Sequence, residues 1–214
     1  MLKVIPLFSQ LSNAELARIE RHMTSHSYER GDVILKQGDA ADSLFVIVSG
    51  QVKVFIADDS REVILSTLSS GELFGELPMF DQEPRSASAS AVGICHLKKL
   101  PYESFRKVLD QSPSIARKVM QAMAVRLRHA DRQIGTLSLM DISSRVSRTL
   151  MELAIMSNGR RIVGDSLTQK DIAGMVGASR EMVNRTLRDL TEKGHIAVQR
   201  RSITILSDTL PACA

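Results

Sequence analysis

The chain has 214 residues, 43% of them hydrophobic, which is enough for a sizeable core and favours two small domains over one large one. It contains no run of about 18 apolar residues and no charged-then-apolar N-terminal segment, so we expect a cytoplasmic protein without a membrane span or export signal. Its two cysteines, Cys95 and Cys213, form no C-x-x-C pair, which argues against zinc sites, iron–sulfur clusters and a disulfide framework.

The net charge of +4 is unevenly distributed. Residues 1–142 carry 17 basic and 17 acidic side chains and are neutral, whereas residues 143–214 carry 11 and 7. All of the excess positive charge therefore lies in the last third of the chain. This asymmetry suits a domain that faces a polyanion, although such an excess is also common on solvated surfaces.

The first part of the chain has the pattern of a β domain. A short helix is predicted at about Asn13–Met23. Alternating apolar and polar segments follow, such as Ser43–Ser49 and Gln51–Ala57, and turns containing glycine or aspartate separate them. Short strands of this kind predict a β-sandwich or β-roll.

From about Pro113 the apolar period changes to that of a long helix. Its apolar residues repeat at spacings of four and three, which forms an a/d heptad seam: Ala116, Met120, Met123, Leu127, Ala130, Ile134 and Leu137. Such a seam favours a homodimer. The alternative is one amphipathic helix packed on its own β domain, and Ile115 and Val119 beside the seam suit that second role.

A further helix is predicted at about Ser143–Met156, followed by the turn-forming residues 157–159. A hinge belongs near Gly135–Asp141. We therefore expect a sensor domain over residues 1–112, a dimerisation helix and hinge over 113–138, and a second domain over 139–214.

The segment from Leu167 to Leu187 predicts a helix-turn-helix. Thr168 and Asp171 have the spacing of a capping box, Gly177 provides the turn, and Ser179 can cap a second helix. His195–Gln199 and Ser202–Leu206 are predicted to form a hairpin, or wing, that turns at Arg200 and Arg201. The alternative is an ordinary helical hairpin whose charged face is only solvated.

The exposed residue types of the second helix match the chemistry of DNA bases. Arginine can donate two hydrogen bonds to guanine and glutamate can accept one from cytosine, so Arg180, Glu181 and Arg185 could read base edges. Other polar side chains near helix N-termini, farther along the helix or in the wing would lie near phosphates: Thr168, Gln169, Ser179, Asn184, Arg188, Arg200 and Arg201.

These motifs resemble the family of bacterial regulators that includes the cyclic-AMP receptor protein and the fumarate and nitrate regulators (CRP/FNR). The resemblance runs from about Phe8 to Leu206 and depends on the cassette Gly71–Phe80 with Arg85–Ala87, and on Ile172–Arg185. It implies an α+β fold with a cyclic-nucleotide-binding β-roll (jelly roll), a dimerisation helix and a C-terminal winged helix-turn-helix. It also implies a homodimer on a palindromic double-stranded DNA operator with TGTGA-type half-sites.

The resemblance also implies a ligand site. In the family, the residue that matches Glu72 holds the ribose 2′-hydroxyl, and those that match Arg85 and Ser86 hold the cyclic phosphate. Gly71 would let the backbone approach the sugar. Leu73 is the remaining residue of the implied site. Where the family's cyclic-AMP binders place threonine and serine against adenine, this chain has Ala130 and Asp131. Asp131 could accept from guanine or lie exposed. The implied effector is cyclic AMP or cyclic GMP, no cofactor being required, but family members that bind cyclic di-GMP, haem or no ligand leave it open.

Two other hypotheses about function remain. One is a constitutive regulator whose β-roll is only a scaffold, and the other is a cyclic-nucleotide-binding module that contacts protein instead of DNA. Catalytic and metal sites are not expected, because the sequence has no Ser-His-Asp, P-loop or paired-carboxylate pattern and its histidines lack ligand spacing. RNA polymerase is an implied partner. Ser157–Gly164 is shorter than the polymerase-contacting segment of the cyclic-AMP receptor, so that contact surface is not carried over.

Overall fold

The computed structural model describes residues 5, 8, 13–58, 62–157, 159–164, 168–199, 202–207 and 210. The chain forms two compact units, Met1–Ile56 with Leu65–Arg128, and Ala57–Ile64 with His129–Ala214. The division falls inside one continuous helix, α4 (Pro113–Leu139), which contributes to both units. Helices and antiparallel sheets are combined as the sequence predicts, and the α+β class is confirmed. None of the helices within these ranges has the length and apolar character of a membrane span.

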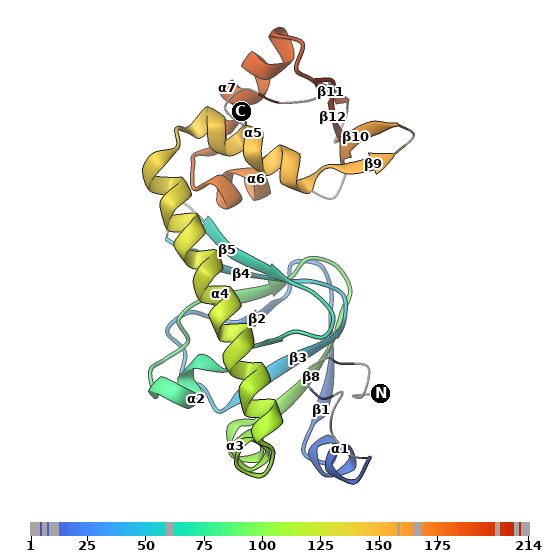
Figure 1. The fold of residues 1–214 in the computed structure, drawn as a ribbon, viewed down its shortest axis with the longest axis vertical. Coiled ribbons are helices and arrows are strands. Elements are labelled where there is room, and N and C mark those ends of the chain that lie inside the picture. The colour runs from blue at the N-terminus through green and yellow to red at the C-terminus, as the bar shows by residue number, and fades with distance from the viewer. Residues whose placement is uncertain are drawn as a thin grey trace. The chain divides into compact units, whose positions relative to one another are not determined.

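In the described part of the chain, two four-stranded sheets form the first unit, apart from Ala57 and residues 62–64, which belong to the second (Figure 1). In order across the first sheet, the strands are β1 (Thr24–Tyr28), β8 (Cys95–Pro101), β3 (Ser43–Ser49) and β6 (Leu73–Phe74). In order across the second, they are β2 (Val33–Leu35), β7 (Ser88–Ala91), β4 (Val52–Ala57) and β5 (Glu62–Leu68). This arrangement confirms the predicted β-roll.

Strand β3 lies between two apolar clusters. Leu44 and Val46 pack into one cluster, whereas Phe45 and Ile47 pack into the other. The alternation predicted for this strand therefore separates two buried faces rather than a buried and a solvated one. The Phe45 ring stacks on Phe74 of β6 with centroids 5.4 Å apart, which fixes the short strand β6 in the core.

The described residues of the first unit also form three short helices and the start of α4. They are α1 (Asn13–Glu20), which ends before the predicted Met23, α2 (Leu77–Asp81) and α3 (Tyr102–Gln111). The start of α4 buries Ile115 and Val119 against the core, and this packing was predicted from their place beside the seam.

Among its described residues, the second unit contains the end of α4, three further helices and one four-stranded sheet. The helices are α5 (Ile142–Leu153), α6 (Gln169–Val176) and α7 (Arg180–Glu192). The sheet order is β11 (Ile196–Gln199), β12 (Ser202–Ile205), β10 (Arg160–Val163) and β9 (Ile155–Ser157). Apolar residues from all three helices and the sheet form one core, which confirms the winged helix-turn-helix.

The hairpin of β9 and β10 was not predicted. The helix expected to reach Met156 ends at Leu153, because Ile155 and Met156 pair with Ile162 and Arg161 of β10 instead. The predicted wing is present as the pairing of β11 with β12. Its tip, Arg200 and Arg201, lies outside the described residues.

Candidate functional site

Helix α7 presents a charged face to solvent, and its start is set by local hydrogen bonds. The Thr168 hydroxyl accepts from Asp171 N while the Asp171 carboxylate accepts from Thr168 N, which confirms the capping box that begins α6. Gly177 then adopts a left-handed conformation with φ of +61°, which glycine adopts without strain. Ser179 Oγ accepts from Met182 N at 3.3 Å and caps α7.

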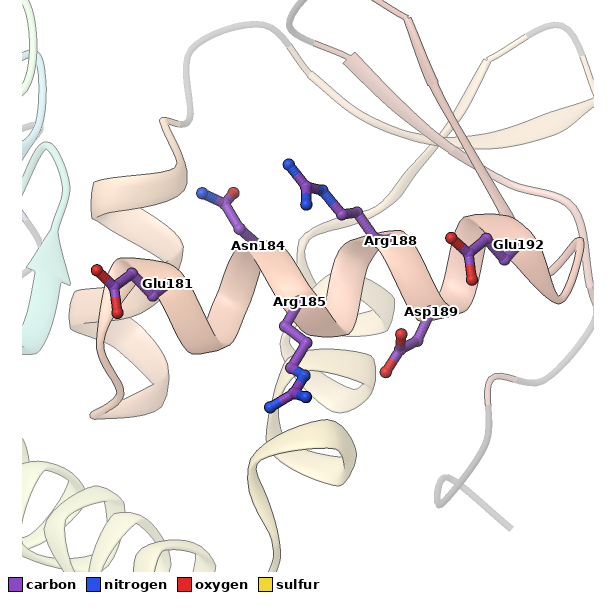
Figure 2. A pocket seen from close by; sticks show the side chains of 6 residues that line it. All are labelled: Glu181, Asn184, Arg185, Arg188, Asp189 and Glu192. Carbon is purple, nitrogen blue, oxygen red and sulfur yellow. The ribbon is translucent and has the colours of Figure 1, made fainter.

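The inner face of α7 is apolar and the outer face is polar. Val183, Leu187 and Leu190 are buried in the core of the second unit. The opposite face lines an open depression whose side chains are shown in Figure 2: Glu181, Asn184, Arg185, Arg188, Asp189 and Glu192. Glu181 and Arg185 project from the first half of the helix, and both are exposed.

The structure thus places the predicted base-reading residues on the exposed side of one helix. Arg180 begins α7 and is also exposed. Asn184 is half-buried, and its Oδ1 has no hydrogen-bond partner among the described residues. Gln169 is exposed at the start of α6. The Thr168 and Ser179 side chains cap their own helices, which limits what they can offer a phosphate.

A second cluster lies in the first unit around Arg85, in the loop between α2 and β7. Arg85 is 6% exposed. Its Nη1 donates to Gly75 O at 2.5 Å and to Tyr102 Oη at 2.9 Å, and its Nη2 donates to Ser43 O at 2.7 Å. A guanidinium has five N–H donors. Within the described part of the chain, the remaining donors of Arg85 are not engaged and can serve an anion, beside the exposed hydroxyl of Ser86.

Glu76 is the carboxylate of this cluster and is 2% exposed. Its Oε1 accepts from Arg126 Nη1 of α4 at 2.6 Å, while its Oε2 is buried and has no partner among the residues described. Burial raises the pKa of Glu76, although Arg126 and Arg85 act to lower it. A buried acceptor without a donor is costly, so Oε2 is suited to a donor supplied by a ligand.

The carboxylate expected from the sequence, Glu72, lies elsewhere. It is exposed, and its Oε2 accepts from Ser69 N at 2.9 Å in the turn before β6. Gly71 N donates to Ile47 O in the same turn, and Leu73 is buried in the core. The structure therefore brings Arg85 together with Gly75 and Glu76, and we replace Glu72 by Glu76 as the candidate carboxylate.

Helix α4 contains both the seam and the two residues predicted to face the base of a bound cyclic nucleotide. Ala130 and Asp131 are exposed. Of the seam, Ala116 and Met123 are half-buried, whereas four larger side chains are left open to solvent: Met120, Leu127, Ile134 and Leu137. These four side chains belong to the seam that the sequence predicts as a dimer interface, and that role stays a prediction. In the described ranges no group of three or more histidine, cysteine or acidic residues could hold a metal ion.

Comparisons with known proteins relate both units to characterised domains. Residues 25–112 match the cyclic nucleotide-binding domain, and residues 144–208 match the Crp-like helix-turn-helix domain. The CRP-like cAMP-activated global transcriptional regulator of Mycobacterium tuberculosis is 30% identical over 204 residues, covering 93% of this chain and 91% of that protein. The cAMP-activated global transcriptional regulator Vfr of Pseudomonas aeruginosa is 34% identical over 201 residues, covering 89% and 92%.

A solved structure shares the fold. The c-di-GMP responsive global regulator CLP of Xanthomonas campestris superimposes with a TM-score of 0.82 at 24% identity, covering 92% of this chain and 100% of that one.

Proposed function

The chain belongs to the CRP/FNR family of transcription regulators, and from this membership we propose that a cyclic nucleotide in its first unit controls how a homodimer binds a palindromic DNA operator. As a family member with a Crp-like helix-turn-helix, the chain is a DNA-binding transcription regulator. The effector, the dimer and the operator sequence are not given by family membership and are our proposals.

One observation supports a cyclic nucleotide as the effector. The buried guanidinium of Arg85 has N–H donors without a partner in the described residues, and it lies in the same cluster as Glu76, whose buried Oε2 has no partner there either. Arg85 holds the cyclic phosphate by charge-assisted hydrogen bonds, and Ser86 adds a compact donor. Glu76 Oε2 accepts a hydrogen bond from a ribose hydroxyl. One anion and one sugar hydroxyl are the two features that every cyclic mononucleotide presents.

Cyclic AMP is the first candidate effector, because the Mycobacterium and Pseudomonas relatives are named as cAMP-activated. Cyclic GMP is the second candidate. Ala130 and Asp131 offer adenine no hydroxyl, and an exposed aspartate on a dimer-forming helix could accept the N1 and N2 hydrogens of guanine. No cofactor is required in either case.

The DNA half of the proposal depends on the outer face of α7. Arg180, Glu181 and Arg185 at its N-terminal end read base edges in the major groove of TGTGA-type half-sites. Two such helices in a homodimer would meet successive major grooves about 34 Å apart. Arg188 and the wing contact the phosphate backbone. RNA polymerase is a further proposed partner, in keeping with a transcription regulator.

Two linked measurements test this function. Calorimetric titration of the protein with cyclic AMP, cyclic GMP and cyclic di-GMP should give heat with a cyclic mononucleotide, and that nucleotide should change the affinity for an operator selected from genomic fragments. Only a ligand with different affinities for two conformations can drive such a switch. No heat with all three would leave a constitutive regulator. Nucleotide binding without any enriched DNA motif would instead indicate a protein-interaction module.

A further inference from the structure

Tyr102 is the first residue of α3 and contacts Arg85 and Gly75, which belong to the cluster described above for the first unit. It is 8% exposed, and a tyrosine hydroxyl buried to this degree normally needs a hydrogen-bond partner. The hydroxyl donates to Gly75 O at 2.5 Å and accepts from Arg85 Nη1 at 2.9 Å. Its ring centroid is 5.8 Å from Arg85 Cζ, within the range of a cation–π contact.

The Gly75 carbonyl oxygen is an acceptor shared by Tyr102 and Arg85. Since Tyr102 also accepts from Arg85, the three groups form a closed ring of hydrogen bonds. This carbonyl belongs to the peptide that joins Gly75 to Glu76. One hydroxyl is therefore bonded both to the side chain assigned to the phosphate and to the peptide that carries the carboxylate assigned to the ribose.

The ring of hydrogen bonds is closely packed. A Cβ added to Gly75 would lie 2.6 Å from Arg85 Nη1, so the guanidinium fits against the bare backbone. Burial raises the pKa of Tyr102, with Arg85 acting against it, so the hydroxyl retains the proton that it donates to Gly75. The Arg85 guanidinium thus has a fixed support on the side that faces α3.

We propose that Tyr102 is a positioning residue for the effector pocket: its hydroxyl fixes the Arg85 guanidinium relative to the Gly75–Glu76 peptide and so sets the spacing between the phosphate-binding and ribose-binding groups. This inference rests on the proposed function, in which Arg85 and Glu76 hold a cyclic nucleotide. Geometry of this kind matters because a ligand that bridges two groups binds well only when both are correctly placed.

Tyr102→Phe tests the inference, because it removes only the hydroxyl. Calorimetric titration of the full chain with cyclic AMP should show affinity lowered about tenfold, the scale of one hydrogen bond to a charged group. The matched control is Tyr28→Phe, the same change at the only other tyrosine, half-buried in β1 and apart from this cluster. Its affinity should stay within about twofold of the wild-type value. Equal affinities of Tyr102→Phe and wild type would overturn the inference.

A double-mutant cycle separates positioning from general support of the fold. Arg85→Lys keeps the positive charge but removes the guanidinium that Tyr102 holds. In that background Tyr102→Phe should cost less than about twofold in cyclic AMP affinity, since no guanidinium is left to position. The full tenfold loss there would show that Tyr102 acts independently of Arg85 and would reject the inference. If the wild-type protein itself binds no cyclic nucleotide, the proposed function fails and not the role of Tyr102 within it.

Discussion

The two carboxylate oxygens of Glu76 have different surroundings. One is paired with Arg126, and the other is buried without a partner in the described part of the chain. Glu76→Gln keeps the shape of the side chain but gives up the charge, so affinity for a cyclic nucleotide should fall by about tenfold, as for one charge-assisted hydrogen bond. Glu72→Gln is the matched control and should leave affinity unchanged in calorimetric titration. A loss in Glu72→Gln alone would return the ribose-binding role to Glu72.

Glu76 also predicts a pH dependence of stability. Burial raises its pKa in the folded chain above the usual value of 4.5, so the folded state takes up a proton at a higher pH than the unfolded state. The free energy of unfolding of wild type, relative to Glu76→Gln, should therefore rise as pH falls from neutral through the folded pKa, and level off below the unfolded pKa. Urea unfolding of both proteins over this range measures the difference. A difference that falls with acidification would contradict the raised pKa.

Base reading can be tested at Arg185. Its replacement by alanine should cost about 1–3 kcal/mol on the preferred operator and relax preference at one guanine, whereas Arg188→Ala should weaken binding to all sequences alike. Competition binding against operators substituted at each position distinguishes the two effects. Unchanged base preference in Arg185→Ala would remove its assigned role.

The sequence alone does not distinguish Glu72 from Glu76 as the candidate carboxylate. The triplet Gly-Glu-Leu occurs at residues 71–73 and again at 75–77, with Phe74 between the copies. Local composition is the same for both, and only the path of the chain separates them. In the first copy, Gly71 and Glu72 lie in the turn before β6 and Leu73 is the first residue of that strand, whereas the second copy leads into α2 beside Arg85. Residue type therefore indicates the cassette, and the burial of Glu76 beside Arg85 favours Glu76 over the exposed Glu72 as the candidate carboxylate.

Elements with a clear local pattern were predictable, including the wing of β11 and β12, whereas the short hairpin of β9 and β10 was not. Helix α4 follows from its heptad spacing, and α6 and α7 follow from their caps. Strand β9 has three residues and is defined by its partner β10, so no local pattern distinguishes it from the end of α5. Propensity and periodicity describe a segment alone, whereas a short edge strand exists only through its neighbour.

The exposed apolar seam of α4 predicts self-association. Leu127 is 65% exposed in the single chain, and Leu127→Lys would place two like charges face to face in a buried seam. Sedimentation should then show monomers. Gln121→Lys introduces the same charge at an exposed position of α4 outside the seam and should leave the dimer intact. A wild-type protein that already sediments as a monomer at micromolar concentration would contradict the dimer.

The molecule has separate hydrophobic cores in its two units. Because each unit buries its own apolar side chains, calorimetric heating should resolve two unfolding transitions. A cyclic nucleotide should raise the midpoint of the transition that belongs to the first unit, since a ligand stabilises the fold that binds it. Operator DNA should raise the other. One transition that both ligands shift equally would show that the units unfold together.

The tight fit of Arg85 against Gly75 offers a genetic tool. A Cβ at residue 75 would clash with Arg85 Nη1. The substituted residue would also have to keep the backbone φ of +76°, which residues other than glycine rarely adopt. Gly75→Ala should therefore displace the Arg85 guanidinium without replacing any residue whose side chain is assigned to the nucleotide or to DNA. A strain that carries this allele would still contain the regulator, but the regulator would no longer bind its effector. Comparing its transcripts with those of a deletion strain would separate the genes that respond to the signal from those that respond only to the protein's presence.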